Sequence, residues 1–266
     1  MSTATHRVWR KPPLISNPIT RWVVILGSAV YLITVIGSLK INWLRAWEGL
    51  PRGGEFVLSF LTPDFTTRWT DISIGIMESL TMTVVSTVLG VMLSVPIALG
   101  ASRNLSPTPA YLVCRGIITL SRAFQEVIVA IFCVALFGFG PFAGVITLSF
   151  ATIGFLAKLL AEDIEDIDHR QLEAIRSTGG SWMQVLNYGV LPQVFPRLVG
   201  LSVYRLDINF RESAVIGIVG AGGIGATLNT AFDRYDFNSA AAILLMIIGI
   251  VLISEYTSGY IRKGLV

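Results

Sequence analysis

The sequence predicts an all-α, polytopic membrane protein with about six transmembrane helices, and three observations lead to this fold class. Of the 266 residues, 53% are hydrophobic and only 14% are charged, which is too apolar for a soluble domain of ordinary composition. Long uncharged runs approach the roughly 20 residues that a helix needs to cross the hydrocarbon core. Glycine and proline clusters lie between these runs, where the chain must turn.

The first part of the chain is expected to hold a tail, one span and an external segment. Residues 1–20 are polar and basic, and we expect them to form a cytoplasmic tail. Trp22–Leu39 is uncharged and is the predicted first span; no small-residue cleavage site follows it, so we interpret it as retained. Residues 21–76 comprise this span and a mixed polar external segment. Three tryptophans indicate anchoring of that segment at the membrane interface: Trp43, Trp47 and Trp69.

Residues 77–266 are expected to form the core of the protein, which contains the five remaining spans. In chain order we place these spans at Ser79–Ala101, Ala110–Phe139, Phe142–Leu160, Arg197–Val219 and Ala240–Tyr260. Polar turns separate them, and the longest polar connection, residues 162–196, follows the fourth span of the chain. With the N-terminus inside, more Lys and Arg fall on the cytoplasmic side than outside, which places this long connection in the cytoplasm.

That cytoplasmic connection is predicted to form a compact projection, Glu173–Pro192, which we call the knob. Helix formers precede Gly179-Gly180, and two adjacent glycines break a helix and permit a sharp turn. Ser181 is then suited to cap a second short helix, and we expect Pro192 to end it. Two short helices at a sharp angle are shaped to enter a groove on another protein.

Charged residues within the predicted third and fifth spans are candidates for function, because a charge at the bilayer centre costs at least about 2.5 kcal/mol. Residues four apart on a helix can pair, so these charges can lock helices together as internal ion pairs. Alternatively, the arginines line a path for an anion, since a guanidinium group matches an oxyanion in charge and geometry. The candidates are Arg122, Glu126, Arg205, Asp207, Arg211 and Glu212.

Residues 220–225 fit the nucleotide-binding pattern G-x-G-x-x-G, but their context excludes that function. A membrane span precedes them, and neither a βαβ unit nor a suitably spaced acidic residue accompanies them. We interpret the glycines as a close-packed turn at the outer end of the fifth span: Gly220, Gly222, Gly223 and Gly225. The chain also lacks a G-x-x-x-x-G-K-[ST] loop, so ATP is expected on another subunit.

The knob resembles the cytoplasmic loop of bacterial ABC importer permeases, whose pattern is Glu-Ala-Ala, three residues, Gly, nine residues, Ile, one residue, Leu-Pro. Five residues match at the family's spacing: Glu173, Ala174, Gly179, Leu191 and Pro192. The sequence departs from the pattern at Ile175, where the family has Ala, and at Gly189, where it has Ile.

Three further stretches resemble phosphonate-type ABC permeases: Glu78–Asn104, Ser121–Val145 and Tyr204–Gly225. The second stretch has Gln125 where a proline is usual in the family, so we expect a weaker helix kink there.

The resemblance implies a type I ABC importer permease fold in the bacterial inner membrane, with both termini in the cytoplasm. It also implies a substrate, namely phosphonate or a related phosphorus oxyanion such as phosphite or phosphate. The implied partners are two ABC ATPase subunits that bind the ATP, a second permease copy as a homodimer, an extracytoplasmic phosphonate-binding protein and the lipid bilayer. No cofactor, metal or nucleic acid is expected on this chain.

Two alternatives belong to other functional classes. An ion-coupled secondary transporter of a small anion would work alone, but such proteins favour internal repeats, and none is evident. A membrane enzyme would need a cluster of His, Cys or acidic residues. The His and Cys residues are few and do not form one: His6, His169, Cys114 and Cys133.

Overall fold

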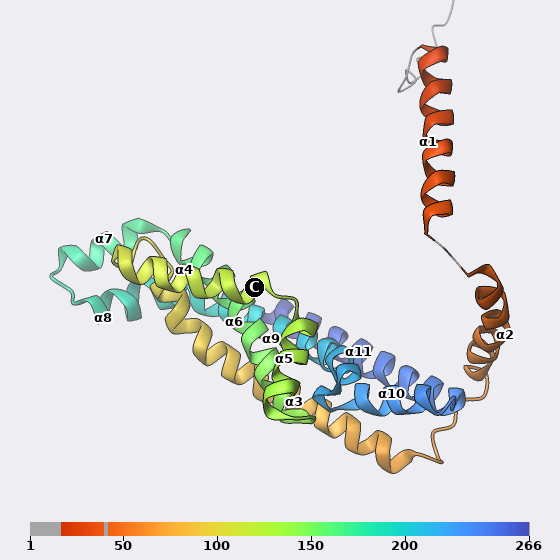
Figure 1. The fold of residues 1–266 in the computed structure, drawn as a ribbon. Coiled ribbons are helices and arrows are strands. Elements are labelled where there is room, and N and C mark those ends of the chain that lie inside the picture. Colours follow the sequence, from red (N-terminus) through yellow and green to blue (C-terminus); the bar gives the residue numbers. More distant parts are fainter. Residues whose placement is uncertain (1–16, 40–41, 266) are drawn as a thin grey trace, which may run out of the picture. The chain divides into compact units, whose positions relative to one another are not determined.

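A computed structural model describes residues 17–39 and 42–265, and all regular elements in these ranges are helices, which confirms the all-α prediction (Figure 1). The chain divides into two compact units, residues 1–54 and 55–266. Most of the predicted cytoplasmic tail, residues 1–20, lies outside the described residues.

The first unit contains α1, Pro18–Ser38, and most of α2, Trp43–Ser59. Helix α1 corresponds to the predicted first span, Trp22–Leu39. It begins where Asn17 accepts a hydrogen bond from the backbone N–H of Ile19 at 3.1 Å, a typical N-cap. Helix α2 lies in the segment that was expected to be mixed and polar, and a helix was not predicted there.

The second unit is built on α3, Trp69–Gly100, which packs along α6, Pro141–Glu165. The buried face of α3 consists largely of Gly, Ser, Thr and Ala, and small residues let two helices approach closely. A Cβ added at Gly90 would lie only 2.3 Å from Cγ2 of Thr152 on α6, so this crossing requires glycine. Helix α3 begins well before the predicted start at Ser79.

The predicted third span, Ala110–Phe139, is two helices rather than one. Helix α4, Thr108–Ala123, and α5, Glu126–Phe137, meet at an angle of 93°. The two residues between them, Phe124 and Gln125, are both extended, with ψ values of 135° and 143°. The expectation of a weak kink at Gln125 was therefore wrong, because an extended pair of residues bends the chain sharply without a proline.

The knob also differs from its prediction. Helix α7, His169–Ser177, ends before the glycines as expected, but α8, Trp182–Gln184, continues through a π-helix, Val185–Val190, into α9, Leu191–Ile216. Pro192 lies in the first turn of α9, where a proline needs no hydrogen-bond partner for its nitrogen. Pro192 therefore starts the long helix instead of ending a short one, and the knob is continuous with the fifth span.

After α9, a π-helical turn, Gly217–Ala221, leads into α10, Ile224–Asp233, a helix that was not predicted. The chain then turns into α11, Phe237–Leu265. In the second unit, α7 and α8 lie at the opposite end from α10 (Figure 1). Four helices in the described ranges are long and apolar enough to cross a membrane, or up to six if each of two bent pairs is one span.

Candidate functional site

The turn of the knob is defined by Gly179, whose φ of +80° favours glycine over residues with a side chain. The N–H of Gly179 donates to the carbonyl of Arg176 at 3.0 Å, and the N–H of Gly180 donates to that of Ile175 at 3.2 Å. These bonds satisfy carbonyls that α7 leaves free at its end. Ser181 occupies the N-cap of α8, and its N–H donates to Oε1 of Gln184 at 2.7 Å. The backbone path through the knob is thus closely specified.

The two departures from the family pattern face each other inside the knob. A Cβ added at Gly189 would lie 3.2 Å from Cδ1 of Ile175 and 3.5 Å from Cδ1 of Leu172. The larger residue at 175 therefore occupies space next to the missing side chain at 189. Relative to the family pattern, one side chain is larger and the other is smaller, so the summed volume of positions 175 and 189 is roughly conserved. Cores tolerate such a paired change better than a volume change at one position.

The inner face of the knob belongs to the core of the second unit. Leu172 of α7 and Val190 of the π-helix are buried in one apolar cluster with Ala98 of α3, Ile118 of α4 and Leu160 of α6. The outer face carries exposed residues of the kinds enriched in protein interfaces: Trp182, Met183 and Tyr188. Among the family-matching residues, Glu173, Ala174, Leu191 and Pro192 are exposed as well.

A charged clamp beside the knob was not predicted from the sequence. Arg115 of α4 donates to both carboxylate oxygens of Glu165 at the end of α6, each at 3.0 Å. The same carboxylate accepts from the backbone N–H of Arg103 at 2.9 Å, and Nε of Arg115 donates to the carbonyl of Ala101 at the end of α3. The clamp joins the ends of α3, α4 and α6.

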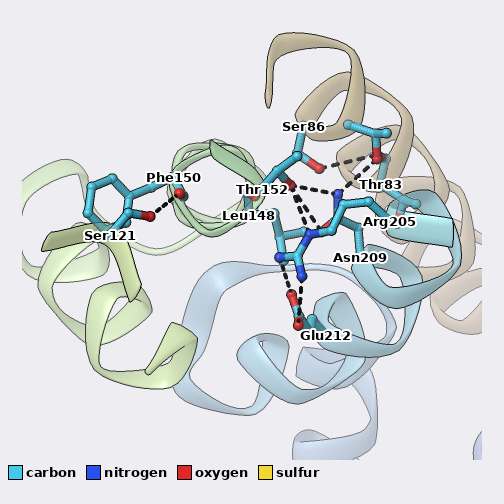
Figure 2. Close-up of polar contacts among 10 residues, drawn as sticks. Thr83, Ser86, Ser121, Leu148, Phe150, Thr152, Arg205, Asn209 and Glu212 are labelled. Atoms are coloured by element: carbon cyan, nitrogen blue, oxygen red, sulfur yellow. Dashed lines mark hydrogen bonds and ion pairs between the residues drawn. The ribbon is translucent and has the colours of Figure 1, made fainter. Parts of the chain in front are cut away.

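Arg205 lies at the centre of a buried polar network (Figure 2). Its side chain is only 3% exposed, and both terminal nitrogens donate to Glu212, at 3.4 and 2.9 Å. Its Nε donates to Oγ1 of Thr152 on α6 at 3.1 Å, and the guanidinium lies over the ring of Phe155. The donors of Arg205 are therefore directed at other residues of this chain.

The network continues through Asn209, which is fully buried between three helices. Its Nδ2 donates to Oγ1 of Thr152 on α6 at 3.1 Å (Figure 2). The same Nδ2 donates to Oγ1 of Thr87 on α3 at 2.8 Å. One amide thus links α3, α6 and α9. Sequence reasoning found the charges but missed Asn209 and the threonines, because neutral polar residues in a span give a weak signal.

The other charged candidates are arranged differently. Asp207 and Arg211, four residues apart on α9, form an ion pair in which Asp207 is buried and Arg211 is 47% exposed. Arg122 and Glu126 do not pair with each other in the described structure, because the break between α4 and α5 separates them. Glu126 instead lies near Arg205 and Glu212.

The glycine-rich turn is packed against two other segments. Gly220, Gly222 and Gly223 all have positive φ values, and the carbonyl of Gly220 accepts from the N–H of Gly140 at 3.0 Å. A Cβ added at Gly225 would lie 2.0 Å from the carbonyl oxygen of Ala214.

The first N–H groups of α10 are capped from α3. The N–H of Gly223 donates to Oε2 of Glu78 at 2.9 Å, and the N–H of Ile224 donates to Oγ of Ser79 at 2.9 Å. A carboxylate at a helix N-terminus is a favourable arrangement. Within the part of the chain that the structure describes, no group of three His, Cys, Asp or Glu side chains is placed to hold a metal ion.

A bundle of apolar helices with a helical knob at one end matches a known class of membrane protein. The family described as "Binding-protein-dependent transport system inner membrane component" matches residues 90–265, and this chain belongs to that family. A structure of the MetNI methionine ABC transporter in an inward-facing conformation aligns with a TM-score of 0.64 and 22% identity, covering 72% of this chain and 94% of that one. The fold is that of a type I ABC importer permease.

Two curated relatives are more similar in sequence. The phosphate-import permease protein PhnE of Mycolicibacterium smegmatis is 41% identical over 245 residues, which is 91% of this chain but 45% of that protein. The putative phosphite transport system permease protein HtxC of Stutzerimonas stutzeri is 35% identical over 241 residues, covering 86% of this chain and 84% of that protein.

Removing the positive charge of the Arg205–Glu212 pair tests whether the network is structural. Arg205→Gln leaves the Glu212 carboxylate inside the bundle without its main partner, and we expect a loss of about 3–5 kcal/mol of stability. The double variant Arg205→Gln/Glu212→Gln is expected to be more stable than Arg205→Gln alone. Thermal unfolding of the purified proteins in detergent measures the stability of the single and of the double variant. Equal stability of the single and double variants would contradict the pairing.

The volume exchange inside the knob is tested by a double-mutant cycle. Gly189→Ile alone forces a side chain against Ile175 and is expected to cost about 1–3 kcal/mol. Combining it with Ile175→Ala restores the family arrangement, and the two changes are expected to couple favourably by about 0.5–3 kcal/mol. Thermal unfolding of the four proteins gives the coupling energy. Purely additive effects would show that the two positions do not compensate each other.

Proposed function

We propose that this chain is the transmembrane permease subunit of an ABC importer that carries phosphonate or a related phosphorus oxyanion, such as phosphite or phosphate. Membership in the binding-protein-dependent family supports the permease role. The names of the two relatives, a phosphate-import permease and a putative phosphite permease, support the substrate class. Phosphonate, phosphite and phosphate share a tetrahedral phosphorus and charged oxygens, so one path suits all three.

The knob has an exposed outer face and a buried inner face, and this arrangement is the main support for the proposal. Its outer face exposes Trp182, Met183 and Tyr188, which suits a contact with another protein. Its inner face is buried in the same cluster as α3, α4 and α6. A partner that moves the outer face therefore also moves the ends of the spans, which is the coupling that an external ATPase requires.

The proposal includes the partners of such an importer. Two ABC ATPase subunits bind ATP and hold one knob each, a second copy of the permease completes the pathway, and an extracytoplasmic binding protein delivers the anion. Both termini and the knob lie in the cytoplasm. ATP closes the ATPase pair, and the two bundles then rock from an inward-open to an outward-open state.

Among the charged candidates, Arg211 and Arg122 remain suited to contact the substrate. Arg205 uses its guanidinium within the chain. Arg211 keeps about half of its side chain exposed beside Asp207, and Arg122 is exposed at the end of α4. An exposed charge inside a span is costly in lipid, so these arginines are expected to face water or the second copy.

A bulky residue at the turn of the knob tests the coupling role. Nothing lies within 4 Å of a Cβ added at Gly179, so Gly179→Phe projects its ring from the knob toward the partner. We expect transport to fall at least about fivefold, a typical allosteric coupling, while the protein still inserts and the ATPase still hydrolyses ATP. Uptake and hydrolysis in proteoliposomes measure the two rates.

Gly179→Ala is the matched control. It incurs the same left-handed backbone cost of about 1–2 kcal/mol but adds only a methyl group. It should retain most of the coupling. Normal transport by Gly179→Phe would contradict the coupling role of the knob.

The substrate class is tested by co-purifying the chain with a candidate ATPase and binding protein. We expect ATP hydrolysis to rise when the binding protein is supplied with a phosphonate, phosphite or phosphate. Sulfate, a tetrahedral oxyanion without phosphorus, is the control and is expected to leave hydrolysis unchanged. A stable complex that no phosphorus compound stimulates would overturn the substrate class, whereas failure to form any complex would overturn the permease role.

A further inference from the structure

Helix α2 has a broad face of exposed apolar side chains. Trp43, Trp47 and Leu50 are 67%, 75% and 61% exposed, and Leu58 further along is 62% exposed. At 100° per residue, these four positions fall within one sector of the helix. Val57 and Leu44 lie at the two borders of this sector and are similarly exposed. Exposed apolar side chains in this number on one helix indicate a contact surface.

The opposite side of α2 is mostly polar. Arg45, Glu48 and Arg52 follow one another at spacings of three and four and form an exposed polar face. Phe56 lies at the border of this polar face, and its ring packs against those of Phe232 and Phe237 at centroid distances of 5.5 and 5.8 Å. The apolar sector is therefore distinct from the face that packs against α10 and α11.

The connections of α2 restrict where this face can lie. The candidate span α1 ends at Ser38, and α2 begins at Trp43, so the linking residues can carry Trp43 at most about 17 Å from the end of the span. After α2, the N–H of Asp64 donates to the carbonyl of Asn238, near the start of the candidate span α11. Both ends of α2 are thus tied to the boundary of the bilayer.

We infer that α2 lies along the membrane surface, with its apolar face in the boundary between lipid headgroups and acyl chains. The helix is too short and too charged to cross the hydrocarbon, and it is not among the candidate spans. Tryptophan favours this boundary because its ring is apolar and its N–H needs a polar partner. Arg45 and Arg52 on the opposite side are placed to reach phosphate groups and water. The partner of this surface is the lipid bilayer itself.

A fluorescent label on single cysteines tests the orientation of the helix. The native Cys114 and Cys133 are first replaced by alanine, and the purified variant must elute as a single species. Bimane is then attached to Leu50→Cys on the apolar face or to Arg52→Cys on the polar face, two residues away. Both proteins are placed in vesicles whose acyl chains are brominated near the headgroup.

We expect bromine to quench bimane at position 50 at least about twofold more than at position 52, because only the apolar face enters the lipid. Aqueous iodide should show the reverse order. Val57→Cys and Glu48→Cys repeat the comparison one or two turns away. Equal quenching at both faces would overturn the inference. A label at position 50 that neither bromine nor iodide reaches would also overturn it, since a protein then covers the face.

Discussion

The structure depends most on the apolar cluster that fuses the knob to the membrane bundle. Leu172 and Val190 of the knob are buried with Leu160 of α6 and Ala98 of α3, so the knob is part of the core. The π-helix leads without a break from α8 into α9, which adds a second rigid connection. Interiors packed in this way transmit displacement. A force applied at the outer face of the knob therefore reaches the spans directly.

A second constraint concerns polar groups inside the bilayer. A polar group there without a hydrogen-bond partner is costly, because no water is available to replace the partner. Asn209 links three helices, and Arg205 is held by Glu212 and Thr152. This network stabilises the bundle and uses the guanidinium of Arg205, whereas Arg211 is paired with Asp207 and remains half exposed. Arginines that look alike in the sequence thus differ in burial and in partners.

The sequence predicted the long apolar spans and the glycine turn of the knob, because hydropathy and adjacent glycines are local signals. The break at Phe124-Gln125 was missed because it depends on two extended residues and not on a proline. Pro192 was assigned to a helix end although the first turn of a helix accepts it equally well. The partners of Asn209 and Glu165 depend on how distant helices are rotated, and sequence spacing does not specify that rotation.

The most direct measurement is the side of the membrane on which the knob lies. In a variant without native cysteines, Ala174→Cys places a thiol on the exposed outer face of the knob. A membrane-impermeant maleimide is applied to intact cells and to inside-out vesicles that lack the partner ATPase. Labelling in the inside-out vesicles alone is predicted, because a cytoplasmic ATPase must reach the knob. Labelling of intact cells would place the knob outside and contradict coupling to such an ATPase.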